Sequence, residues 1–240
     1  MLIKTNAIIL RQIKHSDKAS IVSVYTQSHG RLSLMVYGSS SKKSPGKFAL
    51  LQPLSITEIT ADHQPGKDIG TLKEISSRNP LLNLRIDPVK NALTFFITEL
   101  LTNILRHPEE DDFLYGFICH AITELNDCTT SVADFHLIFM VKLGSILGIE
   151  PNDQQIEAPF FDLLNGHFCQ SRPHHEHFLD KTLTETLRQL MHCDRYTGEQ
   201  ITLSRQHRNE MLNKLLEFYK LHLPDFHTIK SAAILQEIFS

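Results

Sequence analysis

Basic side chains near the N-terminus form the first group that could bind a ligand. Lys42, Lys43 and Lys47 lie in a loop of serine, glycine and proline that runs from residue 37 to residue 48. The side chains that could extend this surface are Arg11, Lys14, Lys18, Arg31 and Tyr37. Ammonium and guanidinium groups neutralise phosphates and release their counterions, and an exposed tyrosine ring stacks on a base. The sequence therefore predicts a surface for an anionic strand.

A histidine-rich segment forms the second group. His174, His175 and His177 follow Cys169, and zinc accepts both residue types. A structural zinc site needs four ligands in a tetrahedron, and adjacent histidine side chains diverge unless the loop bends sharply. The spacing also differs from the H-E-x-x-H pattern of metalloproteases. We therefore interpret the segment as a solvated loop without a metal; a metal-dependent hydrolase built on these four residues is the alternative.

Charge is unevenly distributed along the 240 residues, whose net charge is −3. Residues 1–80 hold 11 Lys and Arg against 5 Asp and Glu, a balance of +6, whereas residues 81–240 hold 13 against 22, a balance of −9. A bipolar chain of this kind favours contact with phosphates through its first part alone. The sequence shows no catalytic triad order, paired acid signature or phosphate-binding glycine loop, so we predict a protein that is not an enzyme.

Five short strands are predicted before residue 80. Residues 31–37 alternate strictly, with Leu32, Leu34 and Val36 on one face and Arg31, Ser33, Met35 and Tyr37 on the other. The other candidates are residues 7–10, 21–25, 54–59 and 72–75. Gly30 can close a tight hairpin by taking a positive φ. Because no helix between these strands is long enough for a parallel crossover, they predict a small antiparallel barrel.

Helices are predicted for most of the remaining chain. Asn79 precedes Pro80, which disfavours helical geometry, so we place a domain boundary there and divide the chain into residues 1–80 and 81–240. Apolar side chains at helical spacing predict helices over residues 88–107, from 111, over 131–148, over 182–192, from 204 to 219 and over 229–238. Residues 150–178 have no helical period. The predicted fold class is α+β, a barrel followed by a mostly helical domain.

Apolar runs and cysteines indicate the compartment. No apolar run reaches the roughly 18 residues of a membrane helix, and residues 7–10 are too short for a signal peptide. Cys119, Cys128, Cys169 and Cys193 form no C-x-x-C pair and are interpreted as reduced thiols. We therefore expect a cytoplasmic protein with no membrane partner.

Several short motifs follow one another along essentially the whole chain. They are Ser16-Asp17, Tyr25-Thr26, His29-Gly30-Arg31, Tyr37-Gly38 with the basic loop to Lys47, Leu51-Gln52-Pro53, Leu147-Gly148-Ile149-Glu150-Pro151, Tyr219-Lys220-Leu221-His222-Leu223 and Lys230-Ser231. In type and order these motifs resemble those of the RecO family, the bacterial recombination mediators of DNA repair. From the residues alone, an RNA-binding barrel with a helical adaptor remains an alternative function.

The resemblance implies a fold, partners and a location. It implies a five-stranded OB-type barrel, a helical domain and, in many members, a Cys₄ zinc module. It also implies binding and annealing of single- and double-stranded DNA at the nucleoid, association with RecR, and contact with the C-terminal tail of the single-strand binding protein, which the family helps to replace with recombinase. Isolated basic residues that could line a groove for that acidic tail are Lys142, Arg188 and Arg195.

The zinc module that the resemblance implies is degenerate in this chain. Asn152-Asp153-Gln154-Gln155 stands where the first cysteine pair is expected. Of the second pair only Cys169 is present, because Arg172 occupies its partner's position. We therefore predict that residues 150–178 form a degenerate zinc-finger-like insert and that the chain has no cofactor.

The basic loop gives a test of DNA binding. If Lys42, Lys43 and Lys47 contact phosphates alone, changing all three to Ala should weaken binding to every oligonucleotide alike. The slope of log K against log[salt] should fall by about 0.7 per lost contact on single strands. Fluorescence titration of a labelled strand at several salt concentrations measures both quantities, and unchanged affinity with an unchanged slope would contradict the assignment.

Overall fold

The chain packs as two compact units, Met1–Asn126 and Asp127–Ser240. The computed structural model describes residues 1–38, 45–64, 66–77, 79–106, 110–196, 201 and 203–239; for Pro45, Lys47 and Phe48 it describes the backbone only. Among the described residues, no helix has the length and apolar character that crossing a bilayer requires.

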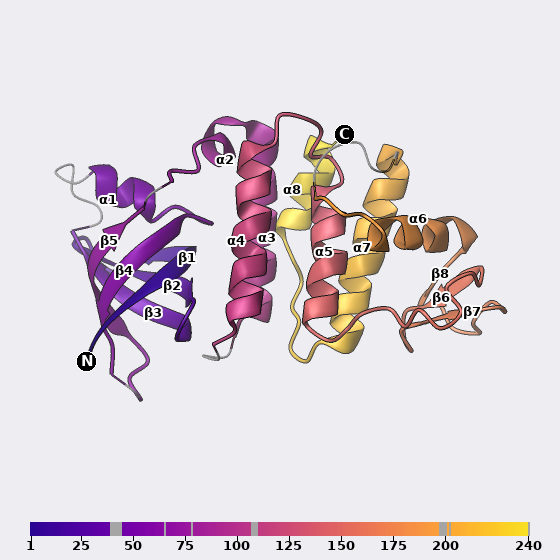
Figure 1. Cartoon of the computed structure of the whole chain (residues 1–240), viewed down its shortest axis with the longest axis horizontal. Coiled ribbons are helices and arrows are strands. Elements are labelled where there is room, and N and C mark those ends of the chain that lie inside the picture. Colours follow the sequence, from indigo (N-terminus) through magenta and orange to yellow (C-terminus); the bar gives the residue numbers. More distant parts are fainter. Residues whose placement is uncertain are drawn as a thin grey trace. The chain divides into compact units, whose positions relative to one another are not determined.

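Five strands of the first unit form a closed barrel (Figure 1). The strands are β1 (Leu2–Lys14), β2 (Ala19–Thr26), β3 (Gly30–Tyr37), β4 (Ile56–Asp62) and β5 (Gly70–Ser76). Their order around the barrel is β1-β2-β3-β5-β4, and four of the five pairings are antiparallel. The predicted five-stranded barrel is confirmed. The closing pair was not predicted: β3 and β5 run parallel through the Leu34–Gly70 and Met35–Thr71 partners.

Alternation along the strands creates the barrel core. Leu32, Leu34 and Val36 of β3 point inward, as predicted, and pack with apolar side chains from the other four strands. Gly30 begins β3 with a φ of 57°, the positive value that the predicted hairpin requires. Gly70 begins β5 where the barrel closes, and a Cβ there would lie 2.8 Å from the carbonyl oxygen of Asp62. Closure of the barrel therefore depends on a residue without a side chain at this position.

Four helices complete the first unit. They are α1 (Pro45–Leu50), α2 (Asn83–Ile86), α3 (Pro88–Ile104) and α4 (Asp112–Asp127). Asp87 caps α3 by accepting hydrogen bonds from the amides of Val89 and Lys90, and Pro88 occupies the first helical position. The short helices α1 and α2 were not predicted. Because α1 begins at Pro45, the second part of the predicted 37–48 loop is helical.

Polar contacts hold α2, α3 and α4 together within this unit. The buried ammonium group of Lys90 donates to the carbonyl of Asn126 at 2.9 Å, and Asn83 pairs with the same residue through both its backbone and its side chain. Arg85 of α2 donates to the carbonyl of Pro53, which ties the helix to the loop before β4. A buried lysine is tolerated here because a helix-end carbonyl accepts its hydrogen bond.

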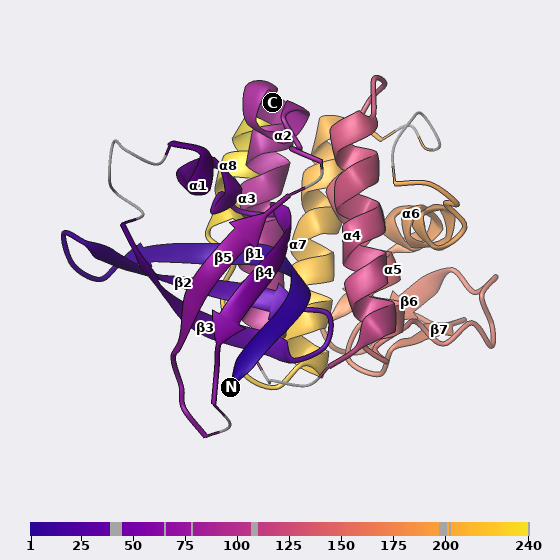
Figure 2. The same ribbon diagram turned by 60° about the vertical axis from the view of Figure 1, so that its left-hand side comes forward.

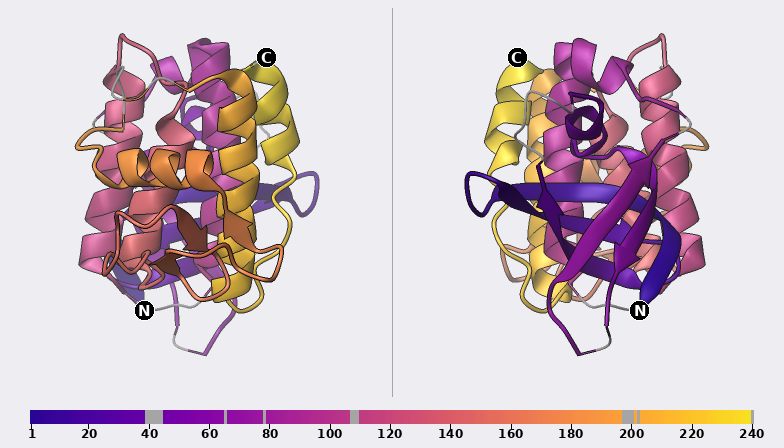
Figure 3. Two further views of the ribbon diagram at one scale, coloured as in Figure 1. Left: turned by 90° about the vertical axis from the view of Figure 1, so that its right-hand side faces the viewer. Right: turned by 90° about the vertical axis from the view of Figure 1, so that its left-hand side faces the viewer.

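The second unit combines helices with a small sheet. Its helices are α5 (Phe135–Ile146), α6 (Lys181–Met191), α7 (Arg205–His222) and α8 (Ser231–Ile238). Its sheet has the order β7-β6-β8, formed by His167–Cys169, Phe160–Asp162 and Phe178–Leu179, and lies beside α6 and α7 (Figure 3, left). Apart from Leu179, these strands lie within residues 150–178, the segment in which the sequence showed no helical period and for which no strand was predicted.

Two fully buried side chains test the packing of the helices in the first unit. Leu100 of α3 and Ile118 of α4 are both 0% exposed. Truncating either to Ala leaves a cavity, so each variant should lower the free energy of unfolding by about 2–5 kcal/mol in urea denaturation. Ile234 of α8 is 57% exposed, and Ile234→Ala is the matched control that should change stability little. Parent-like stability of both core variants would contradict this packing.

Candidate nucleic-acid interface

An apolar strip crosses the outer face of three barrel strands. Ile13 of β1 pairs with Ile21 of β2, and Ile21 pairs with Met35 of β3. Their neighbours Val22, Leu34 and Val36 point into the core, so the three partners point outward. Tyr37 lies two residues further along the same face of β3 and is 62% exposed, while Ile13 is 48% exposed. We call Ile13, Ile21, Met35 and Tyr37 the apolar strip.

Basic residues border the apolar strip. Arg11 pairs with Ser23, and it lies two residues before Ile13 on the same outward face. Lys14 pairs with Ser20 and so alternates to the opposite face, where its ammonium group lies 2.8 Å from a carboxylate oxygen of Asp17. Both partners of that ion pair are highly exposed, so it contributes little stability and is open to exchange with another anion.

The β1–β2 hairpin extends the basic edge. It projects beyond the barrel wall and carries Lys14 and Lys18 (Figures 2 and 3). The carbonyl of Lys18 accepts a hydrogen bond from the amide of Gly38 at 2.9 Å, which places the hairpin next to the end of β3. The structure thus brings Lys18 and Tyr37 into one neighbourhood, and their contact with DNA stays a prediction.

Arg31 and Tyr25 share the outward face but lie at its covered end. The Arg31 guanidinium donates through Nη1 to the carbonyls of Thr102 and Leu105, at 3.0 and 2.9 Å, and through Nε to Ser23. Burial, followed by the charge of Arg106, lowers the pKa of Arg31. Arg31 therefore binds the open carbonyls at the end of α3, which a helix leaves without partners inside the helix.

Tyr25 lies under α4. Only 2% of it is exposed, and its ring centroid lies 6.1 Å from that of Tyr115. Burial raises the pKa of Tyr25 to about 12, with further contributions from Asp111 and Asp112. Because α4 covers it, the Tyr25 ring is not available to stack on a base.

Three predicted site residues are not described at side-chain level. Lys42 and Lys43 lie outside the described residues, and Lys47 lies in α1 with only its backbone described. Their contact with phosphates stays a prediction.

The histidine segment does not gather around a common point. His175 Nε2 lies 3.2 Å from a carboxylate oxygen of Asp162, whereas His177 Nδ1 lies 2.6 Å from one of Glu217. In the described part of the chain, no three His, Cys, Asp or Glu side chains are arranged so that they could hold a metal ion. The residues therefore do not fit the zinc of the family resemblance, and the hydrolase alternative lacks its metal site.

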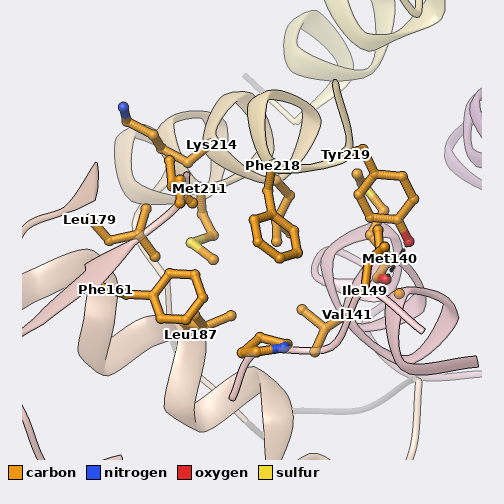
Figure 4. A pocket seen from close by; sticks show the side chains of 14 residues that line it. Met140, Val141, Ile149, Phe161, Leu179, Leu187, Met211, Lys214, Phe218 and Tyr219 are labelled. Atoms are coloured by element: carbon orange, nitrogen blue, oxygen red, sulfur yellow. Dashed lines mark hydrogen bonds between the residues drawn. The ribbon is translucent and has the colours of Figure 1, made fainter. Parts of the chain in front are cut away.

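A second concave site lies in the second unit. A small pocket, with a cavity volume of about 20 Å³, is lined by apolar side chains of α5, α6, α7 and the small sheet (Figure 4). Among them, Phe161, Phe218 and Met211 face one another, and the ammonium of Lys214 points away from them at the outer edge. Lys214 pairs with Glu217 at 3.0 Å. Lys142 and Arg188, predicted for such a groove, do not line it; Lys142 donates to the carbonyl of Asp194 instead.

Some residues of these sites were not predicted from the sequence. Ile21 begins a predicted strand and Ile13 lies beyond the predicted strand 7–10, but only the register shows that both lie in one row with Met35 on the outer face. The alternation in β3 already placed Met35 on the face opposite the core, so this pattern could have identified Met35 as a residue of the outer surface. Lys214 follows from no local pattern, because its pocket is assembled from segments far apart in the sequence.

Comparison with known proteins agrees with this architecture. The family model for the N-terminal part of recombination protein O matches residues 1–81, and the model for its C-terminal part matches residues 85–231. The chain is 37% identical to a DNA repair protein RecO of Phocaeicola vulgatus and 36% identical to one of Bacteroides fragilis. A third, from Porphyromonas gingivalis, is 32% identical, and each comparison covers both chains completely. The chain therefore belongs to the recombination protein O family.

Proposed function

We propose that this protein is a DNA-binding recombination mediator, which binds and anneals DNA strands during recombinational repair. The observation that carries the proposal is the apolar strip with its basic border on an OB-like barrel, in a chain of a DNA repair family. In this proposal the chain makes and breaks no covalent bond, and it works in the cytoplasm at the nucleoid, where its substrate is.

The apolar strip suits a single strand better than a closed duplex. Its exposed members, Ile13 and Tyr37, offer flat or apolar surface to unstacked bases, whereas paired bases bury their faces in the duplex. Arg11 lies beside the strip on the same face, Lys18 lies in the hairpin next to the end of β3, and Lys14 lies at the end of β1 on the other face. We propose that these three cations contact the backbone phosphates. Such contacts give affinity without sequence preference, which an annealing protein needs. Duplex DNA would engage the cations alone.

Protein partners complete the proposed role. With RecR, the protein would help recombinase replace the single-strand binding protein on DNA, as the family resemblance implies. The small apolar pocket of the second unit would receive the Phe-ended tail of the single-strand binding protein only after its lining side chains move apart, because its cavity of about 20 Å³ is smaller than a phenyl ring. Its rings and aliphatic chains have the chemistry that suits an aromatic side chain. Lys214 at its edge has the charge that attracts the acidic part of such a tail.

Arg11 and Arg31 form a matched pair for testing the interface. Arg11→Ala should weaken single-strand binding and reduce the salt slope by about 0.7, because one phosphate contact is lost. Tyr37→Ala should cost about 1–3 kcal/mol of binding free energy and leave the slope nearly unchanged, because stacking releases no counterion. Arg31→Ala should lower thermal stability, since the end of α3 loses its donor, while the salt slope stays as in the parent.

Titrations at several salt concentrations and thermal unfolding of the same variants give these quantities. Annealing of labelled complementary DNA strands, with competition by RNA of the same sequence, then separates a DNA mediator from an RNA-binding module. Equal competition by RNA, or a parent-like titration of both Arg11→Ala and Tyr37→Ala, would contradict the proposal.

The tail pocket has a separate test. A fluorescent acidic peptide that ends in Phe should bind the protein, and deletion of that Phe should abolish binding. Lys214→Glu should weaken binding several-fold because it reverses the charge at the edge, while Lys181→Glu on α6, which does not line the pocket, should have little effect. Equal binding by the peptide without Phe would rule out the pocket as its site.

A further inference from the structure

The β6–β8 module, residues 150–179, stands where the family resemblance implies a zinc module, but its side chains form an unsuitable set of ligands. Cys169 is the single cysteine in it. Burial, and then the nearby Asp162 carboxylate, raise the pKa of the Cys169 thiol. The two histidines with nearby carboxylates point to different partners. The question is what holds the module in place of a metal.

The carboxylate of Asp162 occupies the centre of the module. Its Oδ1 accepts hydrogen bonds from the amides of Leu164 and Asn165, at 2.9 and 3.0 Å. Its Oδ2 accepts one from the Asn165 side chain at 2.8 Å and lies 3.2 Å from Nε2 of His175. Only 6% of Asp162 is exposed. One carboxylate therefore connects the end of β6, the turn that follows it, and the 174–177 segment.

Such a buried carboxylate is stable because its partners compensate for its burial. Burial alone would raise the pKa of Asp162, but the hydrogen bonds from Asn165 and Leu164 and the charge of His175 hold it below its ordinary value. Hydrogen bonds to an ionised acceptor are about twice as strong as those between neutral groups. The charge therefore remains on Asp162 and orders the turn around it.

The position of the missing cysteine has acquired a different interaction. Arg172 stands where the resemblance places the partner of Cys169, and its guanidinium carbon lies 5.0 Å from the ring centroid of Phe178. The Phe178 ring packs edge-on against Phe160 at 6.2 Å, so the contact joins the loop after β7 to the strands β6 and β8. A cation–π contact here connects the segments that a shared metal would otherwise connect.

Side chains of α6 and α7 fix the module from outside. The Arg188 guanidinium donates to the carbonyls of Ile156 and Ala158 and lies 5.6 Å from the ring centroid of Phe168. His222 donates through Nε2 to the carbonyl of Leu163 at 2.7 Å. Both contacts satisfy backbone oxygens of an irregular segment, which would otherwise lack partners away from water.

From these contacts we propose that the β6–β8 module is metal-independent, with the Asp162 carboxylate and the Arg172–Phe178 contact taking over the cross-linking role of zinc. The family's fold is kept in this chain while its inorganic cross-link is replaced by hydrogen bonds, ring contacts and two arginines. The proposal concerns how the module folds and does not depend on the function proposed above.

The first test compares metal content with stability. The full chain, expressed with zinc in the medium, should contain substoichiometric zinc by mass spectrometry, and a chelator should leave its thermal midpoint unchanged. Cys169→Ser should also leave the midpoint unchanged. One zinc ion per chain, a chelator-induced loss of structure, or a Cys169→Ser variant that binds less zinc than the parent would overturn the proposal.

The second test addresses Asp162 directly by hydrogen exchange. Asp162→Asn keeps the volume and removes the charge, so the amides of Leu164 and Asn165 should exchange about tenfold faster or more. The amides of β4 in the other unit serve as the internal reference. Should Asp162→Asn fail to fold, Asn165→Ala removes a single donor and should accelerate exchange in the same turn. Parent-like exchange in a folded variant of either kind would show that the carboxylate is not the centre of the module.

Discussion

Closure of the barrel is the constraint on which the proposed DNA interface depends. A sheet that closes on itself has no long exposed edge, so a ligand must meet either its outer face or its rim. The closing contact is short, two residue pairs between β3 and β5, and the backbone of β5 approaches β4 so closely there that only Gly70 fits. That contact fixes the position of β3, and β3 carries Met35 and Tyr37 of the apolar strip.

The outer face is divided by what covers it. At one end, Arg31 and Tyr25 are occupied by the end of α3 and the side of α4. At the other end, Ile13 and Tyr37 stay exposed although they follow the same alternation. Strand periodicity distinguishes inside from outside, but not covered from open. An outward arginine can therefore serve the packing of the protein itself as readily as a ligand.

This distinction also explains how much the sequence could predict. Strict alternation in β3, the Asp87–Pro88 cap and the helical spacing of α3 to α7 are local, and they predicted the barrel and the long helices. The parallel β3–β5 pair depends on residues 36 positions apart, from Leu34 to Gly70, and no local pattern encodes it. The short strands of β6–β8 are held by Asp162 and Arg188 through contacts that the sequence does not show. Burial of Tyr25 follows from Tyr115, 90 positions later.

The pairing of β1 has a consequence for how the protein is made. β1 pairs with β2 on one side, close in sequence, and with β4 on the other, where Ile3 faces Ala61 and Ile8 faces Ile56. On the ribosome, the β1–β2–β3 meander can therefore form early, while the second edge of β1 has no partner until the chain beyond Asp62 has emerged. An open strand edge invites pairing with other nascent chains. Lys4, whose ammonium later pairs with Glu58 of β4 at 3.1 Å, places a charge on that edge during the interval. During that interval Lys4 has no Glu58 to pair with, so its charge stands alone on the open edge, where charged side chains disfavour pairing with another strand.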